Sequence, residues 1–275
     1  MNILPLVLAL VLMVSVLTVE RLEKFKNHSI VQKEYQVFLK ESERQVFNRR
    51  EKRLFKDYEK SLRQLTFRYF YDKEARDGHL NEAKQYRMLA IELMRTVYGE
   101  AAFFKELERK RPDFLEEILK AIENATEEAP EKLIIETKDL ARLNLEDPEL
   151  QDAFYHMLKG TILRDKLMNL KEKGELTPKM KEKAYVSLFT FIHNEGAKSP
   201  PTIKIGSAPP EILKAVFGND EIVEAILLKR KELGGKDKDS GAEEAFQSEF
   251  IGKRRPGIDE HLLDFKLSAN STKYD

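Results

Sequence analysis

The chain contains 275 residues, of which 41% are hydrophobic and 35% are charged, and its formal net charge is zero. That charge balance argues against general nucleic-acid binding as the main role. The absence of cysteine excludes disulfides, thiolate zinc sites and cysteine nucleophiles. The hydrophobic fraction is sufficient for a buried core, and the high charge content suits long solvated helices.

Residues 1–19 are predicted to form a single-pass transmembrane anchor. The run from Ile3 to Val19 carries no charged residue, and as a helix it would span roughly 25 Å, close to the hydrocarbon thickness of a bilayer. A cleaved secretory signal would need a basic residue before the run and a small-residue cleavage site after it, and neither is visible. A buried core helix is disfavoured because the run has no polar face.

Residues 20–76 are predicted to form one long charged helix, because no Pro or Gly occurs before Gly78 and apolar residues recur every three to four positions. This stretch has 16 Lys and Arg against 10 Asp and Glu, a difference of +6. Its densest basic cluster, between Arg49 and Lys56, is interpreted as a solvated helix face. Contact with anionic lipid or with an acidic partner is the alternative.

Residues 77–195 are predicted to form a helical domain. Helices are expected over Glu82–Val97 and Ala101–Glu108 and again after Pro112. Two further helices should begin where a capping side chain precedes a first-turn proline, at Asp147-Pro148 and at Thr177-Pro178. The second of these should carry the apolar residues Tyr185, Leu188, Phe189 and Phe191. The run Leu133–Ile135 is the only β-leaning segment in this region, and it is too short to assign firmly.

Residues 196–234 are predicted to form a helical hairpin preceded by a short strand at Ile203–Ile205. Pro209 and Pro210 suit the first turn of a helix, and Gly218 can end that helix before Asn219 or Asp220 caps the next one. Both helices carry the same pattern of two adjacent apolar pairs four residues apart. The pairs are Ile212, Leu213, Val216 and Phe217, and then Ile222, Val223, Ile226 and Leu227.

This strand, turn and helix pair resembles the K-type minor pseudopilin of the general (type II) secretion pathway. The resemblance covers about a tenth of the chain and rests on the segment from Ala208 to Leu213 and on the close of the second helix. Lys204, Gly206 and Ser207 stand where the family usually has Asn, Asn and Thr, so the polar turn is only approximated. The motif residues are Ala208, Pro209, Pro210, Leu213, Phe217, Ile226 and Arg230.

The resemblance implies an inner-membrane anchor that packs with other pseudopilin helices, and a helical insertion like the one expected at 77–195. Pseudopilins also have a basic leader cut after Gly, and no such leader precedes the apolar run here. Basic residues follow this run and none precedes it, so charge alone would place the carboxyl-terminal side in the cytoplasm. The family requires the opposite orientation, and an upstream basic leader would remove the conflict.

Residues 235–275 are predicted to contain a flexible loop and a possible final strand. Gly234–Glu244 is rich in Gly, Lys and Asp, which is typical of a loop. The run Leu262–Ser268 alternates loosely and resembles the Ser-rich closing β-segment of the family. If it is a strand, we expect it to pair with Ile203–Ile205 in a small sheet. The whole chain is therefore expected to be mainly α with a small α+β part.

Catalytic and metal-binding patterns are absent from the sequence, so neither a catalytic residue nor a metal ligand is assigned. The five histidines form no metal-binding motif, and His156 is interpreted as a core or boundary residue. The Asp259-Glu260-His261 cluster is interpreted as a solvated turn. Some K-type pseudopilins bind calcium, but the spacing of the acidic residues here does not select calcium over solvent. Those residues are Asp237, Asp239, Glu243 and Glu244.

The leading hypothesis is a non-enzymatic, membrane-anchored component of a type II secretion-like pseudopilus, with its soluble part in the periplasm. It would assemble with other pseudopilins, at the filament tip if the resemblance holds in full. The alternative is a single-pass helical scaffold that faces the cytoplasm. DNA binding through the hairpin is disfavoured, because Gly218-Asn219-Asp220 lacks the Gly-rich, phosphate-accepting turn of helix-hairpin-helix modules.

Overall fold

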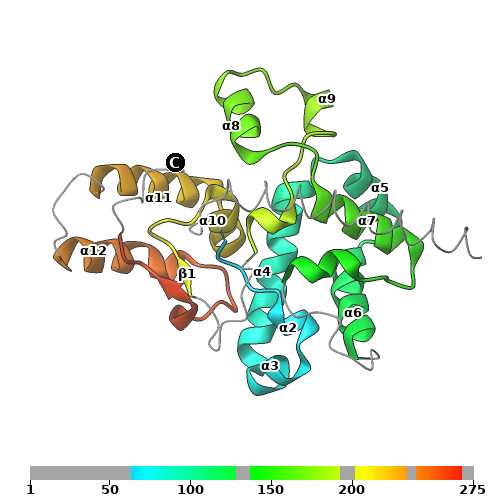
Figure 1. Ribbon diagram of the computed structural model, residues 1–275. Coiled ribbons are helices and arrows are strands. Elements are labelled where there is room, and N and C mark those ends of the chain that lie inside the picture. The colour runs from blue at the N-terminus through cyan, green and yellow to red at the C-terminus, as the bar shows by residue number, and fades with distance from the viewer. Residues whose placement is uncertain (1–62, 128–136, 193–201, 234–239, 268–275) are drawn as a thin grey trace, which may run out of the picture. The chain divides into compact units, whose positions relative to one another are not determined.

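The computed structural model describes residues 63–127, 137–192, 202–233 and 240–267 (Figure 1). This part is 69% helical, with eleven α-helices and two short strands, so the prediction of a mainly α fold is confirmed. Four short 3₁₀ segments also occur, at Thr137–Arg142, Leu188–Thr190, Ile251–Lys253 and Glu260–Leu262. The helices and strands are α2 Arg68–Tyr71, α3 Lys73–Gly78, α4 Leu80–Tyr98, α5 Ala102–Lys110, α6 Phe114–Glu127, α7 Pro148–Lys159, α8 Arg164–Glu172, α9 Pro178–Lys181, β1 Ile203–Lys204, α10 Pro210–Phe217, α11 Asp220–Leu233, α12 Ser240–Phe250 and β2 Leu263–Asp264.

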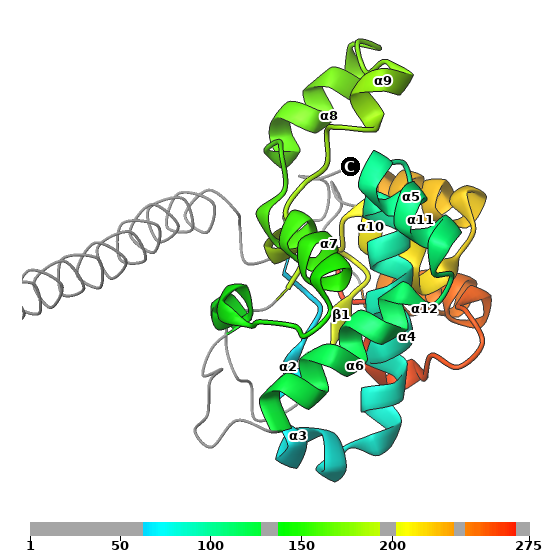
Figure 2. The same ribbon diagram turned by 90° about the vertical axis from the view of Figure 1, so that its right-hand side faces the viewer.

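Helix α4 is the central element of the described residues, which all belong to one compact unit, Tyr58–Asp275. Tyr86, Leu89 and Leu93 are buried along α4, because other helices cover it on more than one side. Helix α10 packs on α4, and α6 contacts both α4 and α2. Figures 1 and 2 show α4 running between the α10–α12 region and the α5–α7 region. The predicted segments 77–195 and 196–234 therefore share one core.

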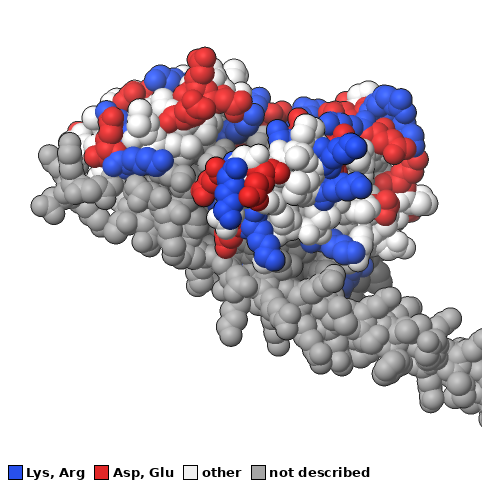
Figure 3. All heavy atoms as spheres, turned by 90° about the horizontal axis from the view of Figure 1, so that it is seen from above, with Lys and Arg blue, Asp and Glu red and all other residues white. Residues whose placement is uncertain are grey.

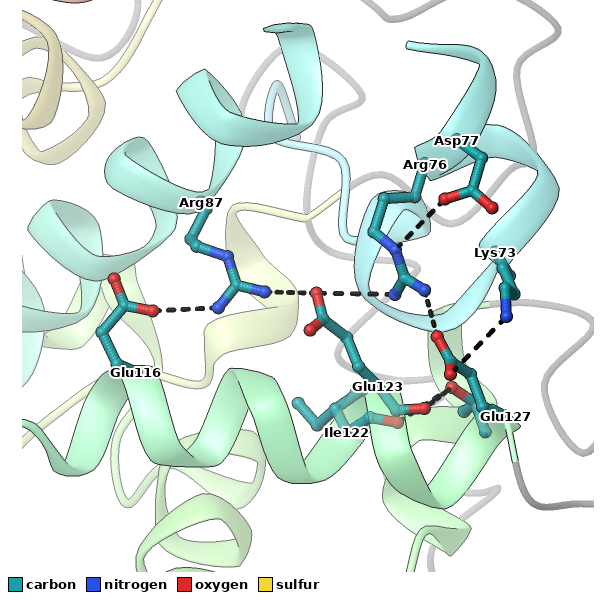
Figure 4. A network of polar contacts seen from close by, with 9 residues as sticks. Lys73, Arg76, Asp77, Arg87, Glu116, Ile122, Glu123 and Glu127 are labelled. Carbon is teal, nitrogen blue, oxygen red and sulfur yellow. Dashed lines mark hydrogen bonds and ion pairs between the residues drawn. The ribbon is translucent and has the colours of Figure 1, made fainter. Parts of the chain in front are cut away.

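A network of charged side chains joins α3 and α4 to α6 (Figure 4). Glu123 of α6 accepts from Arg87 of α4, and its carboxylate lies 3.6 Å from Arg76 of α3. Arg76 also pairs with Glu127, and Arg87 donates to Glu116 at 2.9 Å. Because Glu123 is only 13% exposed, this network is shielded from solvent more than an ordinary surface ion pair.

The long helix predicted over 20–76 is wrong from residue 63 onward. The backbone N–H groups of Gln64 and Leu65 both donate to Phe191 at 3.1 Å, and Leu65 forms a parallel bridge with Ile192. Helices α2 and α3 follow as two short pieces, and the Asp72 side chain caps the second by accepting from the N–H of Ala75. The physical reason is burial, since Gln64–Phe67, Tyr69 and Phe70 are enclosed by the core and leave no continuous solvated face before α3.

The predicted helices of the middle region are mostly confirmed as α4, α5, α6 and α7. The Asp147 side chain accepts from the first backbone N–H groups of α7, as a capping residue should. The helix predicted after Thr177 is wrong in its length, because α9 ends at Lys181. Tyr185 and Phe191 are instead buried in a return segment that contains the 3₁₀ turn Leu188–Thr190. Helix α8 is not predicted by the sequence analysis.

Strands β1 and β2 form the expected small sheet. They pair in parallel, with Ile203 opposite Leu263 and Lys204 opposite Asp264. The predicted pairing of the final strand with the strand before the hairpin is therefore confirmed. Only two residues of each strand take part, so the sheet fixes a register and contributes little core of its own.

The loop predicted over Gly234–Glu244 is wrong from Ser240 onward, where α12 begins. Phe246 and Phe250 are buried on one face of α12, with their ring centroids 5.3 Å apart. Phe246 also contacts Phe265, which follows β2, at 5.7 Å. This aromatic contact stabilises a helix that the Gly- and Asp-rich start of the segment does not suggest.

Several predicted features lie outside the described residues. They are the anchor at 1–19, the charged stretch up to residue 62 with its basic cluster, Leu133–Ile135 and the end of the tail from residue 268. Within the ranges that the structure describes, no helix combines the length and the apolar character needed to cross a bilayer.

Candidate functional site

The predicted hairpin is confirmed as α10 and α11, and its turns form as the sequence indicates. Pro209 precedes α10 and Pro210 is its first residue, where a missing N–H costs nothing. Gly218 ends α10 in the left-handed conformation with φ 74°. The side chain of Asn219 then accepts from the backbone N–H of Glu221 at 2.8 Å and caps α11. Each of these residues thus satisfies a specific requirement of backbone conformation or hydrogen bonding at its turn.

The apolar faces of the two helices are largely buried. Leu213, Phe217 and Ile226 are at most 4% exposed, as expected for core residues of the helix pair. Leu227 is half-buried, so its predicted place in the core is wrong. Leu227 lies between the fully buried Ile226 and the exposed Leu228, at the edge of the buried face of α11.

Arg230 closes the hairpin onto the turn that precedes it. Its guanidinium is fully buried and donates to the carbonyl oxygens of Ile205 and Ala208, the latter at 2.8 Å. Those acceptors lie 25 and 22 residues earlier in the chain. One side chain therefore donates to two backbone carbonyls of the turn that precedes α10. Arg230 holds the strand, the turn and both helices in one arrangement.

Gly206 lies where the chain after β2 passes closest to this turn. A Cβ atom added there would lie 2.1 Å from the carbonyl oxygen of Lys266 and 3.3 Å from the Cα of Leu267. The backbone N–H of Ile205 donates to Asp264 at 2.6 Å beside this contact. Only glycine permits the two segments to approach so closely.

The structure brings the seven predicted motif residues together in one packing unit. Six of them are buried and Pro210 is half-buried. These side chains pack the strand, the turn and the two helices together and are largely shielded from solvent. The residues are Ala208, Pro209, Pro210, Leu213, Phe217, Ile226 and Arg230.

A shallow surface pocket of about 440 Å³ lies at the amino-terminal end of α7. Its lining residues include Glu146, Gln151, Asp152 and Tyr155, and none belongs to the predicted motif. Gln151 accepts from the backbone N–H of Leu145 at 2.6 Å, so it stabilises the loop that forms one wall. The pocket is formed by the loop before α7 and by the first turns of α7, and none of its lining residues belongs to the hairpin.

His156 of α7 is a boundary residue, as predicted. Its ring stacks on Phe103 at 5.2 Å, and its Nδ1 atom lies 3.0 Å from the hydroxyl of Tyr185. Asp152 lies 3.6 Å from the other ring nitrogen. Burial raises the pKa of the Tyr185 hydroxyl, and the nearby Asp152 carboxylate raises it further. The contacts join the return segment at Tyr185 to α5 and α7.

In the described part of the chain, the acidic residues considered for calcium do not form a cluster. Glu243 accepts from the backbone N–H of Leu267 at 3.0 Å, and Glu244 is exposed. Asp237 and Asp239 lie outside the described residues. No group of three or more His, Asp or Glu side chains with metal-binding geometry occurs in the described part of the chain.

Sequence reasoning missed a second helical unit, residues 161–184, which we call the excursion. It contains α8 and α9, leaves the core after Gly160 and returns at Tyr185. At its base the N–H and the side chain of Thr161 bond to the return segment, and Arg164 pairs with Glu211 of α10 at 3.2 Å. Gly160 was the available signal, because glycine often marks an abrupt change of direction.

Comparisons with known proteins give no match to this chain, either among protein-family models, among curated proteins or among solved structures.

Proposed function

We propose that this chain is a membrane-anchored structural component of a type II secretion-like pseudopilus, similar to the K-type minor pseudopilin. The observation that carries the proposal is the unit formed by Ala208, Pro209 and Arg230. The resemblance selected these residues from sequence alone, and they lie together with the guanidinium of Arg230 on the carbonyl of Ala208 at 2.8 Å.

The role proposed is assembly and not catalysis. The apolar segment at 1–19 would hold the chain in the inner membrane and pack with the corresponding helices of other pseudopilins. The soluble part would lie in the periplasm, with the hairpin as a rigid element of its surface. A position at the filament tip is part of this proposal, because the K-type family lacks the surface needed for a further subunit above it.

Membrane topology tests the proposal. Alkaline phosphatase, which is active only outside the cytoplasm, and green fluorescent protein, which folds only inside it, are each fused after Asp275. We expect phosphatase activity and no fluorescence. In a matched variant, Arg21, Lys24 and Lys26 are changed to Gln and Asn2 is changed to Lys. This variant should give higher phosphatase activity, because the positive-inside rule then predicts the same orientation as the proposal.

The opposite result, fluorescence without phosphatase activity, would overturn the pseudopilus proposal. It would favour the second candidate, a single-pass helical scaffold that faces the cytoplasm. The specific observation for that candidate is the basic charge after the apolar segment, at Arg21, Lys24 and Lys26.

A further inference from the structure

The excursion is built as a projection with a narrow base. Thr161 and Ile162 donate their backbone N–H groups to the carbonyl of Tyr185 at 2.8 and 3.3 Å. The Thr161 hydroxyl donates to the carbonyl of Lys183 at 2.6 Å, and the N–H of Ala102 donates to Glu182 at 3.0 Å. Beyond this base α8 and α9 stand away from α7 (Figure 2). The 24 residues between these ties are therefore held at one end.

Apolar side chains of the excursion are not used by the core. Among the 24 residues only Arg164 is buried. Leu163 is 38% and Met180 is 37% exposed, and they are two of the five large hydrophobic side chains that are exposed in the described residues. The other apolar side chains are half-buried, namely Ile162, Leu167, Met168, Leu170, Leu176 and Ala184.

The excursion is also the site of a cationic surface. It has seven Lys and Arg against four Asp and Glu, a difference of +3, whereas the whole chain has a net charge of zero. Its six lysines are all exposed, and none forms an ion pair with a carboxylate of the described residues. Figure 3 shows Lys and Arg side chains, together with Asp and Glu, among uncharged surface on this face of the molecule. The lysines are Lys166, Lys171, Lys173, Lys179, Lys181 and Lys183.

We propose that the excursion lies against an anionic lipid surface. Leu163 and Met180 would enter the headgroup region, while the lysine stems extend along it and place their ammonium groups among the lipid phosphates. Each unpaired lysine near such a surface adds electrostatic attraction. This inference rests on the proposed membrane anchorage, which would keep the soluble part near the bilayer.

The kinds of residues present favour lipid over an acidic protein as the partner. Protein interfaces are enriched in Arg and aromatic residues and depleted in Lys. The one arginine of the excursion, Arg164, is buried against Glu211, and the segment Arg164–Lys181 contains no aromatic residue. Lysine on one face and leucine on another is instead found in amphipathic segments that lie at a membrane surface.

The test uses the absence of native cysteine, which allows a single labelled position in the full chain. Met180→Cys places a polarity-sensitive fluorophore on the excursion, and Leu228→Cys places it on α11, where the native side chain is 61% exposed. Both proteins are reconstituted into nanodiscs of phosphatidylcholine alone or with phosphatidylglycerol added. We expect a blue shift at position 180 only in the anionic discs, and no shift at position 228.

Two controls test the electrostatic origin of that shift. It should be lost at about 1 M salt, where the Debye length is about 3 Å. It should also be lost when Lys166, Lys179 and Lys181 are changed to Glu, with an unchanged circular dichroism spectrum to show that the fold is intact. A shift that survives both changes would overturn the anionic-lipid contact.

The outcomes separate this inference from the proposed function. A chain that enters the discs but keeps the probe at position 180 in water overturns the contact and leaves the anchor intact, as an acidic protein partner would require. Equal shifts at positions 180 and 228 also overturn it, because the contact would then not be specific to the excursion. A chain that does not enter discs of either composition overturns both.

Discussion

The α10–α11 hairpin and the α8–α9 excursion are both pairs of short helices joined by a turn with a left-handed glycine, Gly218 in one and Gly174 in the other. The interactions that stabilise the two helix pairs differ. Five of the eight residues of α10 are buried, whereas α8 buries only Arg164 and α9 buries none. The hairpin is stabilised along its length by apolar packing, and the excursion is stabilised at its base by hydrogen bonds. Similar local geometry therefore gives one core element and one projecting element.

The largest difference should appear when the same charge is introduced in both helix pairs. Leu213→Asp places a carboxylate in a fully buried site of α10, the helix that packs on α4, and we expect a loss of about 4 kcal/mol or more, enough to unfold the chain. Leu163→Asp in the excursion should cost less than about 1 kcal/mol because that side chain is already 38% exposed.

Urea unfolding of the full chain in detergent, followed by the near-ultraviolet signal of its tyrosines, measures both values. Equal losses for the two variants would contradict the distinction between a packed hairpin and an exposed excursion. Native-like stability of Leu213→Asp would contradict the core assignment of α10.

Arg164 and Arg230, the two arginines that are buried in the described part of the chain, give the next comparison. Arg230→Met keeps an apolar stem but leaves the carbonyls of Ile205 and Ala208 without these donors, and we expect a loss of about 3 kcal/mol. Arg164→Met removes the pair with Glu211, whose side chain is 15% exposed and can be hydrated, so about 1–2 kcal/mol is expected. The same unfolding measurement ranks them, and the reverse order would show that Arg230 is not the main connection of the hairpin.

Gly160 and Gly174 show how tightly each end of the excursion is built. A Cβ atom at Gly160, where φ is 60°, would lie 2.4 Å from the backbone nitrogen of Ser187, so Gly160→Ala should cost about 2–3 kcal/mol. Gly174→Ala in the outer turn, where φ is 67°, meets no atom within 4 Å and should cost only about 1 kcal/mol of backbone strain. Thermal unfolding of the two variants side by side checks this. Equal shifts in melting temperature would mean that the base of the excursion is not closely packed around Gly160.

The sequence was sufficient for the hairpin because its signals are local. Paired prolines, a glycine and repeated apolar pairs each act within a few residues, and the strand pairing of Ile203 follows from the same alternation at Leu263. The position of Arg230 was identified only through the resemblance. No local rule states that an arginine near the end of a helix will be buried against carbonyls more than 20 residues earlier in the chain.

The errors arose where distant segments decide the structure. Leu65 is extended because its N–H meets Phe191, which is over 100 residues away in the sequence. Tyr185 was predicted to be helical, but its segment runs back beside Thr161, whose N–H donates to the Tyr185 carbonyl. Helix α12 is stabilised by the contact between Phe246 and Phe265. Helical spacing of apolar residues indicates that a segment is buried, but it does not indicate which neighbour satisfies the backbone.

A further small effect is expected at Tyr98, which joins the two ends of the excursion. Its hydroxyl lies 3.0 Å from the carbonyl oxygen of Met157, before the excursion leaves, and 3.1 Å from that of Val186, after it returns. Tyr98→Phe should therefore cost about 1 kcal/mol at neutral pH by removing one buried hydrogen-bond donor. No change would mean that the hydroxyl does not stabilise the base.

The pH dependence of that cost tests whether Tyr98 is buried as described. Burial raises the pKa of its hydroxyl well above the ordinary value. Above pH ~10 the unfolded chain therefore binds fewer protons than the folded chain at this residue, and native stability falls by about 1.4 kcal/mol per pH unit for the group. The phenylalanine side chain of the variant has no such proton, so the difference in unfolding free energy between the native protein and Tyr98→Phe should shrink to about zero near pH 11.

Urea unfolding at pH 7, 10 and 11 measures this difference in unfolding free energy. A constant difference across this range would show that Tyr98 ionises equally in both states and that the base of the excursion is open to water.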